Sequence, residues 1–148
     1  MFEGLEFDNT MKVEARRLDS LMADEAAIGI LKVDTEGHDL AVIEGMGKLR
    51  PEAVMLEVWD EEFIFNQGKT ENRLIDYARR MDKNYYNHSV LFWRDSLSND
   101  FGITLNAVDT CPGGWGNVLF MHDSGAFEAV RSYLKGRFRR VSDAASFF

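Results

Sequence analysis

The chain has 148 residues, a length that fits one ordinary domain and leaves no room for two large ones. Hydrophobic residues make up 45% of the sequence and only 2 residues are proline, which excludes collagen-like and low-complexity chains. The 25 acidic residues outnumber the 17 basic residues, and the net charge is −8. Because an acidic surface repels phosphate groups, we expect no general binding to nucleic acid or to anionic membranes.

The cysteine content and the N-terminal sequence indicate the compartment. Cys111 is the only cysteine, so no disulfide can form within the chain, and a reducing environment is expected. Residues 1–11 lack the basic and apolar segments of a secretory signal, and no apolar run is long enough to cross a bilayer. These features predict a cytoplasmic protein. No repeat or linker marks a boundary, so residues 1–148 are interpreted as a single domain.

The first part of the chain alternates predicted strands and helices. Residues 11–17 alternate apolar and charged side chains, which predicts a short edge strand. Residues 28–33 are almost continuously apolar, which predicts a strand buried on both faces inside a parallel sheet. Residues 38–50 place apolar side chains three apart and predict a helix. Residues 53–58 form a second apolar run, interpreted as another buried strand.

The alternation continues in the second part. Residues 71–81 carry an apolar helical face, and residues 90–93 and 117–121 are predicted strands. Between these two strands, residues 95–116 are predicted as a long connection, which is either a binding loop or disordered.

The C-terminal part predicts one more helix. Asp123 or Ser124 can cap it, and Gly136 would end it. Alternating strands and helices of this kind predict an α/β layered sheet. In such sheets ligands bind outside the carboxyl ends of the strands, because the loops there carry free backbone groups and helix N-termini.

The densest group of reactive side chains follows the strand predicted at residues 28–33. It consists of Asp34, Glu36, His38 and Asp39, three carboxylates and one imidazole within six residues. A carboxylate there could accept a proton from a bound hydroxyl, attract a cation or ligate a metal. The structural alternative is that Asp39 caps the next helix while the other three side chains are solvated or only end the strand.

Residues 31–46, with the sequence LKVDTEGHDLAVIEGM, resemble the central signature of FkbM-type methyltransferases. The resemblance implies an S-adenosylmethionine-dependent enzyme with the seven-stranded Rossmann-like sheet of class I methyltransferases. Such enzymes methylate hydroxyl groups of small molecules and glycans. Residues 17–21 resemble the Leu-Asp element before the signature, residues 51–57 resemble the next strand with its terminal Glu, and residues 117–121 resemble the last strand.

The resemblance also implies roles for individual residues. Asp34 and Glu36 would line the floor of the methyl-transfer site, where one of them orients the acceptor or takes its proton. His38 falls in a variable polar position of the signature and is the third candidate catalytic residue. Asp19 and Glu57 are weaker candidates, assigned to cofactor binding.

One part of the family pattern has no counterpart in this sequence. In the family the methyl donor is held mainly by a glycine-rich turn and an acid after the first two strands, because only glycine lets the backbone approach the cofactor closely. The chain is therefore expected to be a partial sheet that lacks the N-terminal cofactor-binding strands and binds the donor poorly alone. One edge of residues 28–33 would then be unpaired, so either residues 11–17 fold over that edge, or a second chain covers it, or the protein aggregates. Of these outcomes, self-association is predicted.

Three functions are left open at this point. The leading one is S-adenosylmethionine-dependent methyl transfer to a hydroxyl of a small molecule or glycan. The second is a non-catalytic remnant or subunit that associates with itself through its open edge. The third is a divalent-metal site built from Asp34, Glu36 and His38, because hard oxygen ligands suit Mg²⁺ or Mn²⁺.

Overall fold

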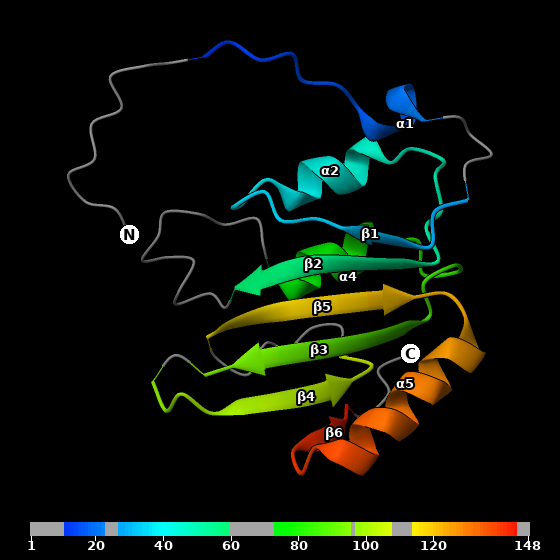
Figure 1. The fold of residues 1–148 in the computed structure, drawn as a ribbon. Helices are drawn as coiled ribbons and strands as arrows, with labels where there is room; N and C mark the ends of the chain where they lie inside the picture. Colours follow the sequence, from blue (N-terminus) through cyan, green and yellow to red (C-terminus); the bar gives the residue numbers. More distant parts are fainter. Residues whose placement is uncertain (1–10, 23–26, 60–72, 96, 108–113, 145–148) are drawn as a thin grey trace.

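The computed structural model describes residues 11–22, 27–59, 73–95, 97–107 and 114–144. These residues form a six-stranded mixed sheet with helices packed against it (Figure 1). The elements in chain order are α1 (Leu18–Leu21), β1 (Ile30–Lys32), α2 (Asp39–Gly45), β2 (Ala53–Trp59), α4 (Leu74–Arg80), β3 (His88–Arg94), β4 (Phe101–Leu105), β5 (Trp115–Met121), α5 (Ser124–Arg137) and β6 (Val141–Asp143). This arrangement confirms the predicted α/β class and is compatible with a partial Rossmann-like fold.

The strand order of the sheet is β1-β2-β5-β3-β4-β6. β1 and β2 are parallel, while β5 is antiparallel to both of its neighbours, β2 and β3. β3 therefore runs in the same direction as β1 and β2. β4 is antiparallel to β3, and the short β6 pairs with β4 in parallel (Figure 1).

Helices α2 and α4 pack on one face of the sheet. Their buried side chains, among them Ile43 and Leu74, join one hydrophobic cluster with Val54, Leu56 and Val58 of β2. These three β2 residues alternate along the strand, as the period of two requires for one buried face. The helices predicted around residues 38–50 and 71–81 are thus confirmed, with shorter bounds.

Helix α5 packs on the opposite face through Phe127 and Leu134. It begins as predicted, because the Asp123 carboxylate accepts hydrogen bonds from the backbone N–H groups of Gly125 and Ala126. Gly136 lies inside the helix, which ends one residue later. No helix in the described ranges combines the length and the apolar character that crossing a bilayer requires.

Two of the expected strands differ from the structure. Residues 11–17 have exposed side chains and no regular structure, so the prediction of an edge strand is wrong. Alternating side chains form a strand only where a neighbour accepts its backbone hydrogen bonds. The strand predicted at residues 28–33 exists as β1 and lies at the edge of the described sheet, which agrees with the expected unpaired edge, but its Ile30 side chain is 71% exposed. Burial on both faces is therefore wrong.

The long connection predicted at residues 95–116 is also wrong in part. It contains β4, which forms a hairpin with β3 and buries Ile103 and Leu105. Residues 108–113, which include Cys111, lie outside the described residues. β6 was not expected, and its three residues are recognisable as a strand only through their pairing with β4.

Candidate active site

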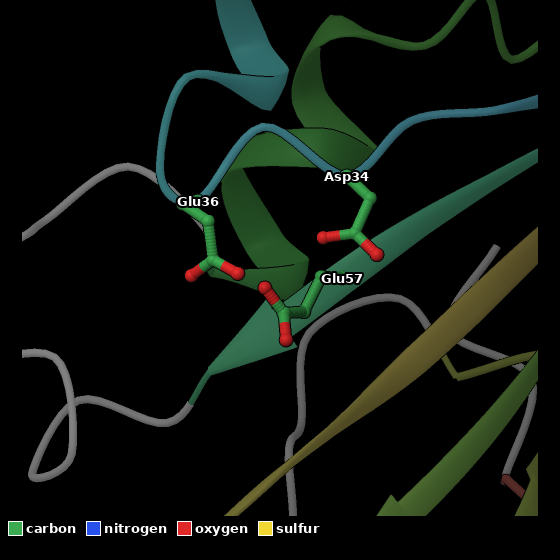
Figure 2. A group of neighbouring side chains, drawn as sticks. All are labelled: Asp34, Glu36 and Glu57. Atoms are coloured by element: carbon green, nitrogen blue, oxygen red, sulfur yellow. The ribbon is translucent and has the colours of Figure 1, made fainter. Parts of the chain in front are cut away.

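Three carboxylates converge where the parallel strands β1 and β2 end (Figure 2). Asp34 and Glu36 lie on the turn that follows β1, and Glu57 lies near the end of β2. One carboxylate oxygen from each residue lies within 4.8 Å of the other two. The register explains the meeting, because Lys32 pairs with Met55 and two further residues along each strand bring Asp34 beside Glu57.

The turn after β1 has an unusual backbone. Glu36 has a φ angle of 53° and Gly37 a φ angle of 107°, so two consecutive residues adopt left-handed conformations. Glycine does this readily, but a residue with a Cβ atom loses about 1 kcal/mol. The turn reverses the chain between β1 and α2, and the Glu36 side chain points toward Glu57 (Figure 2).

Glu57 is the member of the cluster best suited to hold a proton. Burial raises the pKa of its carboxyl group, a hydrogen bond from Trp59 acts in the opposite direction, and the negative charges of Asp34, Glu36 and Asp39 raise it further. Its Oε2 atom is buried and has no hydrogen-bond partner within the described part of the chain. A carboxyl group with a raised pKa is a stronger base than an ordinary glutamate.

Lys32 lies beside Asp34 of the cluster. The Lys32 ammonium group is 3.0 Å from Asp34 Oδ2, and both side chains are about half exposed. An ion pair in contact with water contributes little to stability and is screened by salt. The Lys32 ion pair therefore neutralises little of the Asp34 charge, and a carboxylate in this position attracts a cationic group or a proton.

Asp39 lies behind the cluster and is fully buried. Its Oδ1 accepts hydrogen bonds from Thr35 N (2.9 Å) and Thr35 Oγ1 (2.5 Å). Its Oδ2 lies 3.4 Å from the backbone N of Glu57 and 3.5 Å from the hydroxyl of Tyr77. The structural alternative is wrong in this respect, because the Asp39 side chain bonds to the preceding turn and α2 begins without a side-chain cap.

The sequence around this cluster matches a known protein family. Residues 3–99, which are 97 of the 148 residues, match the family model of the methyltransferase FkbM domain. The chain belongs to the FkbM methyltransferase family. No curated protein and no solved structure matches it.

The FkbM match contains all three converging carboxylates and the buried Asp39. It ends before β4, so β4, β5, α5 and β6 lie outside the matched region. The resemblance carried by residues 31–46 is thereby confirmed at the level of the family. The converging carboxylates therefore lie both in the region that matches the family and at the strand ends where α/β sheets bind ligands.

The FkbM signature also pointed to His38, which the structure places apart from the three carboxylates. Its side chain is exposed at the start of α2 and lines an open hollow of about 470 Å³ on the outer side of that helix. Apolar residues, among them Leu18, Leu21 and Val42, form much of the wall of this hollow. His38 and the carboxylate cluster therefore line different parts of the surface.

Asp19 and Glu57 were the two cofactor-binding candidates. Asp19 lies near the C-terminal end of α2, away from the carboxylate cluster. Its carboxylate is 2.7 Å from the guanidinium group of Arg17, and a Cβ atom on Gly47 would collide with it. The hydrogen bond from Arg17 lowers the pKa of Asp19. The FkbM domain thus brings Asp34, Glu36 and Glu57 together and holds Asp19 in a contact between α1 and the end of α2.

Proposed function

We propose that this FkbM domain is an S-adenosylmethionine-dependent methyltransferase that acts on a hydroxyl group of a small molecule or glycan. The observation that carries the proposal is the convergence of Asp34, Glu36 and Glu57 at the ends of two parallel strands, within the region that matches the family. The carboxyl ends of such strands are where α/β sheets bind their ligands. We further propose a cytoplasmic location, which the single cysteine favours.

The charge of the cluster suits the methyl donor. S-adenosylmethionine supplies an electrophilic methyl group on a positively charged sulfonium, and the converging carboxylates are acidic groups that attract a cation. The turn that follows β1 contains a single glycine, Gly37, so it is not a glycine-rich turn. The proposed contact therefore involves the sulfonium end of the donor, whose positive charge the carboxylates attract. We assign no residue to the adenosine part.

The carboxylates can also handle the acceptor. A hydroxyl group becomes a better nucleophile when a base within hydrogen-bond reach takes its proton. Asp34 and Glu36 are exposed enough to meet an acceptor, and Glu57, with its raised pKa, is suited to hold the proton afterwards. We assign orientation of the hydroxyl to Asp34 and Glu36 and proton storage to Glu57.

The test is transfer of an isotopically labelled methyl group. The chain is incubated with S-adenosylmethionine carrying the label and with a panel of hydroxylated small molecules and glycans. With the donor in large excess, because a partial sheet is expected to bind it poorly, we expect label on at least one acceptor. Asp34→Asn and Glu57→Gln should each lower kcat about 100-fold or more, because the first removes the carboxylate that orients the hydroxyl and the second removes the proton acceptor. The matched control is Glu52→Gln, an exposed acid just before β2, which should keep wild-type activity.

Two outcomes would contradict this assignment. If no acceptor is labelled and calorimetry detects no heat of binding for S-adenosylmethionine, the chain is not an independent methyltransferase. If turnover or thermal stability depends on added Mg²⁺ and is lost with a chelator, the cluster functions as a divalent-metal site instead. The expected result is that neither Mg²⁺ nor the chelator changes the rate.

A non-catalytic, self-associating subunit is the second candidate, and the edge position of β1 favours it. Ile30 and Lys32 are exposed there, and within the described part of the chain β2 is the one strand that pairs with β1. An edge strand of this kind offers unpaired backbone groups to another strand. Binding of S-adenosylmethionine separates the two candidates, since a subunit of this type needs no methyl donor.

A further inference from the structure

The buried Asp39 side chain connects two separate parts of the site. Its Oδ1 accepts both hydrogen bonds of Thr35, the residue that lies between Asp34 and Glu36 on the turn after β1. Its Oδ2 faces the backbone N–H of Glu57 on β2 at 3.4 Å. A buried acidic group is stable only when donors surround it, so this position requires the turn and β2 to stay close.

Tyr77 of α4 holds the same strand from a third direction. Its side chain is fully buried, and its hydroxyl donates a hydrogen bond of 2.8 Å to the carbonyl oxygen of Glu57. Burial and the nearby acids raise the pKa of this hydroxyl, so it stays protonated and can act as a donor. Both backbone groups of Glu57 therefore face a buried polar side chain.

The position of these bonds matters because the turn is strained. Glu36, with its left-handed backbone, directly follows Thr35. A strained conformation persists only when surrounding contacts hold it, and such strain is common at functional sites. The two hydrogen bonds from Thr35 to Asp39 are contacts of this kind.

We propose that Asp39 and Tyr77 are positioning residues, which hold the turn after β1 against the end of β2 so that the three carboxylates converge. Neither residue belongs to the converging group itself. The catalytic meaning of this inference rests on the proposed function, but the geometric part can be measured without turnover. The measurable quantity is the pKa of Glu57, because it depends on how closely the turn approaches β2.

The first test compares two buried tyrosines. Tyr77→Phe removes the hydroxyl bonded to Glu57, and Tyr86→Phe removes a similar bond of 2.9 Å to the carbonyl oxygen of Pro51, just before the other end of β2. The Glu57 carboxyl group is titrated by NMR in both variants and in the wild type. We expect its pKa to fall toward the ordinary glutamate value in Tyr77→Phe, since water enters and the other carboxylates move away, and to stay unchanged in Tyr86→Phe.

The second test uses the turn and avoids any change in the core. Thr35→Val keeps the shape of the side chain and removes the hydroxyl bonded to Asp39, whereas Thr35→Ser keeps the hydroxyl. The pKa of Glu57 should fall in the valine variant and return in the serine variant. In the methyl-transfer assay, Thr35→Val should lower kcat about tenfold without changing KM for the donor, because misplacement of reacting groups acts on the chemical step.

The outcomes separate this inference from the proposed function. If the pKa of Glu57 stays at the wild-type value in both Tyr77→Phe and Thr35→Val, the positioning role is overturned. If it falls in both while no variant and no wild-type sample transfers a methyl group, the positioning role holds and the proposed function fails. An equal fall in Tyr86→Phe would indicate general loosening of the core and would also overturn the inference.

Discussion

Glu57 shows how a single residue connects stability with chemistry. Its raised pKa means that the folded chain holds the Glu57 proton more tightly than the unfolded chain does. The stabilisation from this proton is fully present below the ordinary glutamate pKa of the unfolded chain. It is lost as the pH rises through the higher pKa of the folded chain, so ionised Glu57 destabilises the fold at neutral pH.

Replacing this acid should therefore stabilise the protein. We expect Glu57→Gln to raise the free energy of unfolding at about pH 7 by about 0.5 kcal/mol after solvent screening, and the gain should disappear below about pH 4. Urea denaturation of both proteins across this pH range measures the difference. Equal stability at every pH would show that Glu57 titrates as an ordinary glutamate. A gain together with lost activity is the trade-off expected at a functional site.

At the scale of single residues, the sequence predicted the three carboxylates of the site but not the buried acid behind them. Asp34 and Glu36 were identified from their place after an apolar run, and Glu57 from the family resemblance. The burial of Asp39 could not be predicted, because a turn with alternating acids does not reveal which one points inward. That choice depends on Tyr77, which lies 38 residues further along the chain and reaches the turn only through the fold.

At the scale of elements, β3 and β5 approach each other closely at Gly116. A Cβ atom at this position would collide with the carbonyl oxygen of Phe92 and crowd the Cα atom of Trp93. These two strands form the centre of the sheet with β2. Glycine is therefore required here for close approach of the backbones.

Substitution of this glycine should separate the strands. We expect Gly116→Ala to lower the free energy of unfolding by about 2–3 kcal/mol, because overpacking forces the backbone to move. The matched control is Gly136→Ala in α5, where a Cβ atom meets nothing within 4 Å and alanine favours the helix by up to about 1 kcal/mol. Thermal unfolding of both variants should show opposite shifts, and a stable Gly116→Ala would contradict the close approach.

Sequence patterns predicted best the strands that have a neighbouring strand on both sides and the helix that has an N-terminal cap. β2, β3, β5 and α5 were found at nearly their observed bounds because their apolar periodicity reports burial directly. β4 was missed since Gly102 interrupts its short apolar run, and its burial comes from pairing with β3. The pattern of residues 28–33 likewise predicted a strand but could not show how many neighbours it has.

At the scale of the whole molecule, β1 forms one edge of the sheet that the described residues build. Its Ile30 side chain is exposed there. Among the described residues, no strand pairs with the outer side of β1. Apolar side chains beside unpaired backbone groups favour contact with a second chain.

Self-association through this edge is the expected behaviour. Sedimentation measurements on the wild type should show a mass that rises with concentration, and Ile30→Lys should shift the protein toward the monomer, because charge on an edge strand opposes pairing. Leu97→Lys, at a side chain that is 94% exposed between β3 and β4, is the matched control and should not change the mass. If the wild type is a monomer at every concentration, the β1 edge is not an interface between copies of the chain.

The order of the strands has a consequence for synthesis on the ribosome. β5 lies between β2 and β3, yet it follows both of them along the chain. Until residues 115–121 have left the ribosomal exit tunnel, β2 and β3 have no shared neighbour, and the described part of the nascent sheet consists of the parallel pair β1–β2 and the hairpin β3–β4, each with open edges. The central strand joins both fragments at once, so we expect β2, and with it the carboxylate cluster, to become fixed only after residues 115–121 have been synthesised.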